Sequence, residues 1–418
     1  MRFFIHTLGC KVNQYESQAL REAWLAQGMS EAASPDQATL ILVHSCAVTS
    51  KAVAESRGAA SRLAREASQA RIVVCGCAAR TEPEAFKGCG ARVEIIPKIS
   101  EAAGSGPADS RQPWPDLAIT GFTRARPVIK IQDGCSHGCA FCVVPRAKGP
   151  SRSRPYGQIL AEAQRLLAAG HRELIISGIN LSQFVLDSPC GGLWDLLARL
   201  ERDLAPAWSG LARLRLSSLD PGLLTSQALD VLAGSAMLCR HLHISLQSAD
   251  PGVLKAMGRE HYDPTEILNF LAALGLAWPV FGLGADLLTG FPGESEEAYV
   301  ATLDFCRQAR LSHGHVFPYS RRPGTIAAKI GGQLRQGVKK ARAAELRALI
   351  REKNGLFLER LAGLPLVVLA AESLEPLSGV CEYYVECRVD GSCLAPRGAL
   401  VPARPLRVSG QKLMVEAL

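Results

Sequence analysis

The sequence of 418 residues contains no long apolar run, no internal repeat and no low-complexity segment. Its longest apolar stretch, from Phe270 to Leu283, contains Pro279 and is shorter than the ~20 apolar residues that a membrane-spanning helix needs. The first residues resemble a strand and lack a small-residue cleavage site, so we expect no secretory signal. These absences favour a cytoplasmic protein that does not cross a membrane.

The composition is that of a globular chain. Hydrophobic residues make up 48% and charged residues 21%, which excludes a disordered protein and allows a sizeable core. The net charge of +8 is mildly basic and favours a polyanionic partner. A chain of this length is expected to form two or three domains.

Strand-like and helical patterns alternate over the first hundred residues. Strands are predicted at Arg2–Thr7, Ala38–His44, Arg71–Val74 and Arg92–Pro97, and helices at Gln14–Gln27 and Thr49–Ala67. This order predicts an open parallel sheet with helices on both faces. Cys10, Cys46 and Cys77 follow the first three strands. Because parallel strands end at one edge of a sheet, these cysteines should converge there.

The same alternation continues in the middle of the chain. Strands are predicted at Pro127–Gln132, Glu173–Ser177, Arg213–Ser217, His241–Leu246, Phe281–Leu288 and His315–Tyr319. Six β/α units indicate a partial or complete TIM-type barrel, with its site at the carboxyl ends of the strands.

Short strands predominate at the end of the chain. They are predicted at Leu366–Ala370, Glu382–Val389, Ala399–Val401 and Lys412–Val415, which suits a small five-stranded β-barrel. Soft boundaries lie at Ser100 to Gly121 and Asn354 to Leu364. The predicted α/β architecture therefore has three domains, over residues 1–118, 121–352 and 362–418.

Three of the 14 cysteines, Cys135, Cys139 and Cys142, stand in C-x3-C-x2-C spacing after the first predicted barrel strand. Three thiolates can hold a four-iron cubane and leave one iron open, whereas a simple electron carrier uses four cysteines. An open iron can bind the amino and carboxylate groups of S-adenosylmethionine, and the cluster can then release a 5′-deoxyadenosyl radical. The alternatives are a zinc loop, with His137 as a fourth ligand of poor reach, or buried thiols.

Motifs along the chain carry a family resemblance. They are Thr7–Ser17, His44–Thr49, Val74–Ala78, Gly149–Arg154, Arg215–Leu219, His241–His243, Leu254–Arg259, Gly290–Glu294 and His315–Ser320. With the cysteine triplet, they resemble the radical S-adenosylmethionine methylthiotransferases over nearly the whole chain. Within that family the sequence is most similar to enzymes that act on N6-threonylcarbamoyladenosine in tRNA.

The resemblance implies a second [4Fe–4S] cluster on Cys10, Cys46 and Cys77, with three buried core thiols as the alternative. It implies that one S-adenosylmethionine methylates sulfur on this cluster. A second yields the radical that takes hydrogen from C2 of the adenine, where sulfur and methyl are then transferred together. It also implies a tRNA substrate and an electron donor such as flavodoxin or ferredoxin. A monomer is the default expectation.

Residues beside the cluster loop and at later strand ends are candidate contacts for S-adenosylmethionine. They are Phe141, Gly178, Ser217, Gln247 and Arg259. Loop packing, a turn or loop hydrogen bonding is the alternative for each.

A run of cations next to the cluster loop predicts contact with RNA phosphates. It comprises Arg146, Lys148, Arg152 and Arg154, with no acid among them. A solvated surface is the alternative. The last domain resembles a TRAM module, yet its near-neutral charge suits stacking better than electrostatic anchoring.

The remaining cysteines lack ligand spacing. Cys75 should share a strand face with Cys77, and we interpret it as a core residue. Core or surface roles are expected for Cys89, Cys190, Cys239 and Cys306, and structural roles for Cys381, Cys387 and Cys393.

Three other functions compete with the leading prediction. A related enzyme could act on isopentenyladenosine in tRNA or on an aspartate of a ribosomal protein. A protein of another class would be a non-catalytic, zinc-dependent RNA-binding protein. The segment Lys11–Ser17 favours threonylcarbamoyladenosine, because relatives with the other substrates differ there.

Overall fold

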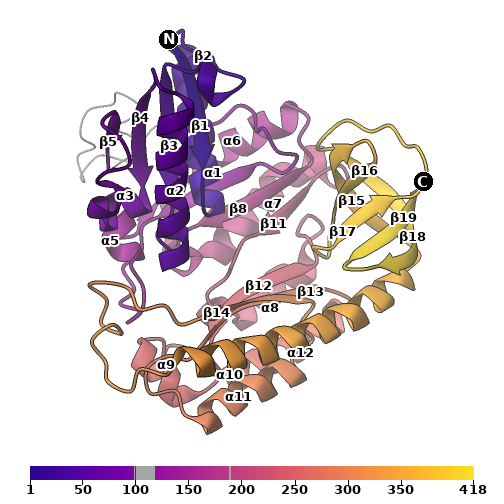
Figure 1. The fold of residues 1–418 in the computed structure, drawn as a ribbon. Helices are drawn as coiled ribbons and strands as arrows, with labels where there is room; N and C mark the ends of the chain where they lie inside the picture. The colour runs from indigo at the N-terminus through magenta and orange to yellow at the C-terminus, as the bar shows by residue number, and fades with distance from the viewer. Residues whose placement is uncertain (98, 100–117, 188–189) are drawn as a thin grey trace.

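The computed structural model describes every residue except 98, 100–117 and 188–189, and it contains three units in sequence order (Figure 1). Most of the predicted boundary from Ser100 to Gly121 lies outside the described residues. In Figure 1 the N-terminal unit is indigo and purple, the central unit is pink to orange, and the C-terminal unit is yellow. No helix among the described residues is long and apolar enough to cross a membrane.

The N-terminal unit is a five-stranded parallel sheet in the order β2-β1-β3-β4-β5, as predicted. Its strands are β1 (Arg2–Thr7), β2 (Ser30–Glu31), β3 (Leu40–Ser45), β4 (Arg71–Gly76) and β5 (Val93–Ile95). Its helices are α1 (Lys11–Ala26), α2 (Ser50–Glu66) and α3 (Cys77–Thr81), with short 3₁₀ turns at Pro35–Gln37 and Pro83–Phe86.

Both faces of this sheet are covered, which explains why its central strand is a continuous apolar run. Every residue of β3 is buried. Ile41 and Val43 belong to the core on one face, and Leu42 packs with Phe3 and Trp24 on the other. Successive side chains of a strand point to opposite faces, so the alternation assigns each residue to its core.

The central unit is a six-stranded partial barrel, which confirms the predicted fold. Its parallel strands are β6 (Val128–Asp133), β8 (Glu173–Gly178), β11 (Arg213–Leu216), β12 (His241–Gln247), β13 (Gly282–Thr289) and β14 (His313–Pro318). Two sheets, β11-β8-β6-β7 and β12-β13-β14, are joined by single bridges from Leu214 to Leu238 and from Leu219 to Ile244. The short β7 (Arg152–Ser153) pairs antiparallel with the end of β6.

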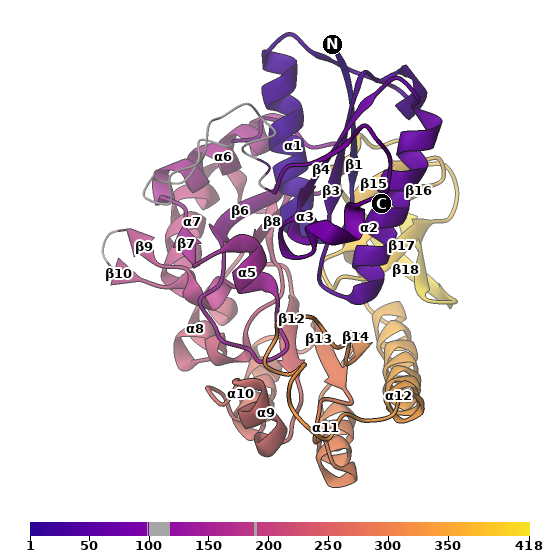
Figure 2. The same ribbon diagram turned by 60° about the vertical axis from the view of Figure 1, so that its left-hand side comes forward.

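Helices alternate with these strands around the outside of the barrel. They are α5 (Val144–Lys148), α6 (Tyr156–Ala168), α7 (Leu193–Trp208), α8 (Ser226–Gly234), α9 (Pro251–Met257), α10 (Pro264–Ala277) and α11 (Glu296–Gln308). A small hairpin, β9 (Leu186–Asp187) with β10 (Cys190–Gly191), and 3₁₀ turns at Leu181–Gln183 and Pro221–Leu223 complete the unit. Helix α1 of the N-terminal unit packs against β6 and β8 (Figure 2).

The long helix α12 (Gln336–Ala362) leads to the C-terminal unit, a closed five-stranded barrel. Its strands are β15 (Val367–Leu374), β16 (Leu377–Cys381), β17 (Glu386–Val389), β18 (Leu400–Ser409) and β19 (Lys412–Ala417). The predicted strand Glu382–Val389 is wrong in its first half, and β16 was missed. Residues 382–385 form a turn instead, in which Tyr384 has a φ of +64°. Their aromatic and β-branched composition resembles that of a strand.

Two buried arginines fasten the C-terminal barrel to the central unit. Arg213 donates to the carbonyl of Val368 at 2.7 Å, and Arg215 donates to that of Cys381 at 2.8 Å. Glu173 on β8 neutralises both guanidinium groups, at 2.6 Å from Arg213 and 2.5 Å from Arg215. Backbone carbonyls of one unit thus complete a charged network of another.

Candidate iron–sulfur and cofactor site

The loop after β6 carries the predicted triplet Cys135, Cys139 and Cys142, and all three are half-buried. Gly134 begins the loop at a φ of +71°, and a Cβ there would lie 1.9 Å from the carbonyl oxygen of Pro150. The Cys135 amide donates to Gly149 at 2.9 Å. Glycine at this position therefore allows the loop to lie against the Gly149–Pro150 turn.

Each sulfur of this triplet accepts a hydrogen bond. Val144 donates its amide to Cys142 at 3.4 Å, Arg259 donates Nη1 to Cys139 at 3.6 Å, and Asn180 donates Nδ2 to Cys135 at 3.8 Å. Donors of this kind stabilise thiolates and tune iron–sulfur clusters. Asn180 was missed by the sequence reasoning, although its place just after the second barrel strand is a usable signal.

Burial disfavours the charged thiolate form of these cysteines in the absence of a metal. Burial is the main cause that raises the pKa of Cys142, to about 11, and the neighbouring Cys139 and Cys135 thiols also raise it. Burial likewise raises the pKa of Cys139. Metal ions would offset this penalty, because coordination favours the thiolate.

Arg259, a predicted cofactor residue, contacts a cluster thiol directly. Besides Cys139, it donates Nη2 to Asp220 at 2.8 Å and to the carbonyl of Ser245 at 2.9 Å. These fixed partners hold the guanidinium group beside the loop. Phe141, also predicted, is half-buried and packs against the small core around Met257 and Phe291.

Gly178, Ser217 and Gln247 lie at the carboxyl ends of β8, β11 and β12, as expected. A Cβ on Gly178 would be 2.9 Å from that of Gln132, whose amide oxygen accepts from Asn180 at 2.8 Å. Ser217 is buried. Gln247 adopts a φ of +65° where the β12–β13 register shifts, a strained conformation of the kind found at functional sites.

The second predicted triplet occupies one edge of the N-terminal sheet. Cys10 precedes α1, Cys46 follows β3, and Cys77 begins α3 directly after β4. Burial raises the pKa of Cys77 to about 12, and the Cys10 and Cys46 thiols also raise it. A Cβ on Gly9, where φ is +93°, would lie 2.8 Å from the sulfur of Cys46. Glycine thus keeps the space beside that sulfur clear.

Neither triplet has the geometry of a zinc site. Three sulfurs at about 2.3 Å from one tetrahedral zinc would lie about 3.8 Å apart. Among the described residues, the groups of three or more potential ligands within 4.8 Å of one another include no cysteine. In each triplet, at least one pair of sulfurs is therefore more than 4.8 Å apart, wider than a single zinc ion requires.

Cys75 is a core residue but does not share a face with Cys77. It is completely buried with Phe3 and Leu42, whereas Cys77 contacts the core on the opposite face of the sheet. The reason is Gly76, whose φ of +94° ends the strand and breaks the alternation. Cys89, Cys239, Cys306, Cys381 and Cys387 are also buried, and Cys393 is half-buried. The side chain of Cys190 lies outside the described set.

A buried ion network joins the two cysteine-bearing units. Glu16 on α1 lies 2.6 Å from Lys130 on β6 and 2.7 Å from Lys148, six residues after Cys142. Burial alone would raise the pKa of Glu16, but the two ammonium groups hold it well below its usual range. This carboxylate therefore connects the helix that follows Cys10 with the segment that follows Cys142.

The structure reduces the number of cations in the basic run that can contact phosphates. Lys148 is engaged by Glu16, and Arg154 is buried and pairs with Glu162 at 2.8 Å. Their partners lie on α1 and α6, so these two cations are structural here, contrary to expectation. Arg146 remains exposed, and the side chain of Arg152 is 36% exposed.

Four histidines and an aspartate line the barrel interior, a cluster that sequence reasoning missed. His243 lies 3.2 Å from His313 and 3.0 Å from Asp286, and Asp286 accepts from His315 at 2.9 Å. His241 stacks on Tyr384 of the C-terminal barrel, with ring centroids 4.5 Å apart. The alternating histidines at 241 and 243, and at 313 and 315, are a signal that two strands face one interior.

Comparisons with known proteins first define the class. Residues 2–96 match a family described as "Uncharacterized protein family UPF0004", and residues 129–306 match the radical SAM superfamily. The fold is similar to that of the radical S-adenosylmethionine methyltransferase TsrM from Kitasatospora setae, with a TM-score of 0.56. That match is 18% identical and covers 78% of this chain and 73% of that chain. The protein is thus a radical S-adenosylmethionine enzyme with one [4Fe–4S] cluster implied by its superfamily.

Curated relatives then define the family. "Threonylcarbamoyladenosine tRNA methylthiotransferase MtaB" of Bacillus subtilis is 32% identical over 82% of this chain and 79% of its own. "tRNA-2-methylthio-N(6)-dimethylallyladenosine synthase" of Jannaschia sp. is 30% identical over 93% and 88%. "Ribosomal protein uS12 methylthiotransferase RimO" of Chloroflexus aurantiacus is 29% identical over the full length of both. The chain belongs to the radical S-adenosylmethionine methylthiotransferase family, which sets aside the non-catalytic zinc-protein alternative.

Proposed function

We propose that this enzyme methylthiolates C2 of N6-threonylcarbamoyladenosine beside the anticodon of tRNA. The observation that carries the proposal is the pair of thiol triplets on two units that Glu16 connects through Lys130 and Lys148. The substrate is supported by relatives with that printed name in Bacillus subtilis and Rickettsia prowazekii, at 32% and 30% identity.

In this proposal each triplet holds a [4Fe–4S] cluster and has its own task. When bound, the cluster on Cys135, Cys139 and Cys142 supplies the electron that cleaves S-adenosylmethionine. Arg259 and Asn180 orient this loop through their hydrogen bonds to its sulfurs. The triplet on the N-terminal sheet would hold the cluster from which sulfur is delivered.

We propose that the surface around the cluster loop of the central unit receives RNA in the cytoplasm. Arg146, which is exposed and donates to the Pro323 carbonyl, and Arg152, which is partly exposed and lies 3.7 Å from Asp133, are the cations of the basic run proposed to contact phosphates. The C-terminal barrel, with five Lys or Arg and six Asp or Glu from Leu361 to Leu418, would contribute shape and stacking. An electron donor such as flavodoxin or ferredoxin would serve a monomeric enzyme.

Mass spectrometry of tRNA nucleosides tests the substrate. In a strain that lacks the only copy of the gene, 2-methylthio-N6-threonylcarbamoyladenosine should disappear, and complementation should restore it. Its persistence would contradict the proposal. Loss of the methylthio group from isopentenyladenosine, or from an aspartate of ribosomal protein uS12, would instead assign the substrate of the other relatives.

A further inference from the structure

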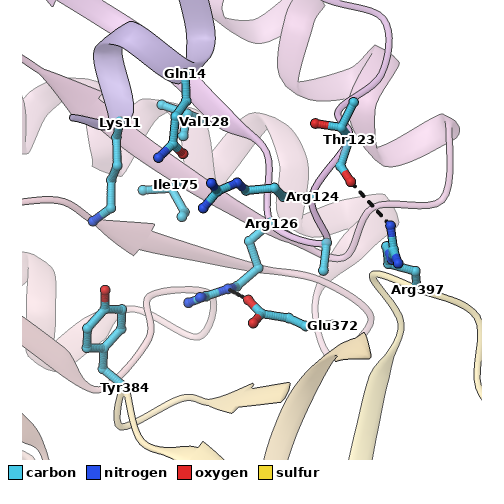
Figure 3. Close-up of a pocket in the computed structure, with 11 residues that line it drawn as sticks. Lys11, Gln14, Thr123, Arg124, Arg126, Val128, Ile175, Glu372, Tyr384 and Arg397 are labelled. Atoms are coloured by element: carbon cyan, nitrogen blue, oxygen red, sulfur yellow. Dashed lines mark hydrogen bonds and ion pairs between the residues drawn. The ribbon is translucent and has the colours of Figure 1, made fainter. Parts of the chain in front are cut away.

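A cavity of about 490 Å³ lies where the three units meet (Figure 3). The N-terminal unit contributes Lys11 and Gln14 from α1. The segment before β6 contributes Arg124 and Arg126, and the C-terminal unit contributes Tyr384 and Arg397. Figure 3 shows the Lys11 and Gln14 side chains pointing down from the helix and the Tyr384 hydroxyl pointing up toward them. Residues from all three units thus face one space.

The charge of this junction pocket is strongly positive. Four cations line it, with one carboxylate, Glu372. Arg126 donates Nε to the Glu372 carboxylate at 2.7 Å, so that carboxylate is already paired. Arg397 donates to the carbonyl of Thr123 at 3.3 Å. Lys11 makes no ion pair with any residue that the structure describes. The pocket therefore contains more positive charge than its own side chains neutralise.

The environment of Lys11 favours an incoming anion. The Lys11 side chain is half-buried in the pocket wall. Its ammonium group is 5.8 Å from the centroid of the Tyr384 ring. An anion bound here would find a cation that is already partly desolvated, so the pair would be stronger than one fully exposed to water.

Tyr384 forms a fixed wall of the pocket. Its backbone is held at a φ of +64°, and its ring stacks on His241, with His313 5.2 Å away. Arg126 and Arg215 lie 5.8 and 5.4 Å from the same ring centroid. A strained aromatic residue held by neighbours on several elements provides a rigid surface for a ligand.

The pocket begins next to the proposed sulfur-bearing site. Lys11 follows Cys10 directly, so their Cα atoms are about 3.8 Å apart. The reacting C2 and the substituted N6 belong to the same adenine ring system. A base whose C2 faces the N-terminal thiols can therefore extend its N6 substituent toward Lys11.

We propose that the junction pocket binds the carboxylate of the threonylcarbamoyl group, with Lys11 as the specificity-determining residue. This inference rests on the proposed function and deepens it. An isopentenyl group is apolar and uncharged, and it would leave Lys11 without an ionic partner in the pocket. The same cations could also bind a phosphate of the RNA backbone, and the experiment separates these two anions.

The test uses two anticodon stem-loop RNAs that differ only in the free carboxylate of threonylcarbamoyladenosine and its methyl ester. For the free acid, Lys11→Met should raise KM at least about tenfold, as expected for a lost charge-assisted hydrogen bond. Lys11→Arg should recover most of the affinity. For the ester, the wild-type enzyme and Lys11→Met should have similar KM values. Lys51→Met, an exposed lysine of the same unit, is the matched control.

Iron content and S-adenosylmethionine cleavage are measured for each variant, because Lys11 adjoins Cys10. If Lys11→Met loses iron, Arg124→Met, which lies on another element, provides the same comparison. An equal rise in KM for both RNAs would assign the pocket to backbone phosphate and overturn the inference, as would no rise for either. Failure of the wild-type enzyme to modify the free-acid RNA would overturn the proposed function itself.

Discussion

Glu16 is the residue on which the junction between the two triplets depends. Its side chain is 5% exposed and contacts two buried ammonium groups. Removing one member of a buried ionic group leaves uncompensated charge, which costs far more than the loss of a surface pair. No pattern around Glu16 in the sequence indicates this role, because Lys130 and Lys148 are more than a hundred residues away.

Glu16→Gln should therefore lower the free energy of unfolding by about 3 kcal/mol. Anaerobic guanidinium unfolding, followed by tryptophan fluorescence, measures the change. Glu31→Gln is the control, since its pair with Arg21 is partly exposed and should contribute no more than about 0.5 kcal/mol. Equal effects of the two substitutions would contradict the buried network.

The histidines inside the barrel should make stability depend on pH. Burial is the main cause that lowers the pKa of His313 to about 3, and His243 and His315 also lower it. Below about pH 6.5 the unfolded chain binds a proton that the folded protein excludes, so stability falls as the pH falls toward 3. At pH 5.5 this loss should be about 1.4 kcal/mol relative to neutral pH.

His313→Asn should remove that part of the acid sensitivity, as measured by unfolding at pH 7.5 and pH 5.5. His315 has the opposite sign, because its hydrogen bond with Asp286 raises its pKa. Its stabilising contribution is present below pH 6.5 and is lost as the pH rises through the folded pKa. His315→Asn should thus increase the loss in acid. An unchanged pH dependence in both variants would refute this assignment.

At the scale of elements, the connection from β6 into the cluster loop depends on Gly134. Its Cβ position is 1.9 Å from the Pro150 oxygen and 2.7 Å from that of Gly149, and both contacts are with backbone. Backbone atoms cannot move aside as a flexible side chain can. An alanine there should displace the loop that holds Cys135.

Gly134→Ala should therefore lose the cluster of the central unit and keep the other, so iron falls from about eight to about four atoms per chain. Cleavage of S-adenosylmethionine should be lost with it. Gly157→Ala, at a position in α6 where a Cβ meets nothing within 4 Å, should keep both. Full iron and full cleavage activity in Gly134→Ala would show that the loop tolerates the side chain.

Most elements could be predicted because their cores are periodic. Strand β1 has the predicted bounds, and the six barrel strands lie within about two residues of expectation. Helix α1 begins at Lys11 rather than Gln14, since polar residues at its first turn hide the start. The turn at 382–385 was misread because Tyr384 adopts a φ that its residue type rarely does.

At the scale of the whole molecule, the sequence predicted which strand ends come together but not which charged residues pair with one another. The convergence of Cys10, Cys46 and Cys77 could be predicted because strand order brings the ends of parallel strands together. Their role as cluster ligands is implied by the family resemblance and stays a prediction. The roles of Lys148 and Arg154 could not be predicted, because their acidic partners lie on helices that tertiary packing brings near. The junction pocket could not be predicted either, because its lining residues come from all three units.

The docking of the C-terminal barrel shows why this unit matters to a distant site. Glu173 and Arg215 anchor it to the inside of the central barrel, and its turn carries Tyr384 against His241. The near-neutral charge of the barrel is consistent with this structural role, because the barrel contributes the Tyr384 ring and the interface with Glu173 and Arg215. Electrostatic attraction of RNA would be left mainly to the other two units.

The most direct test of the account compares two triple variants with the wild-type enzyme by iron content, S-adenosylmethionine cleavage and methylthio product. The variant with Cys10→Ala, Cys46→Ala and Cys77→Ala should retain about four irons and the cleavage reaction, yet form no methylthio product. The variant with Cys135→Ala, Cys139→Ala and Cys142→Ala should retain about four irons and lose both activities. Methylthio product from the first variant, or no loss of iron in either, would contradict the assignment of two clusters with separate tasks.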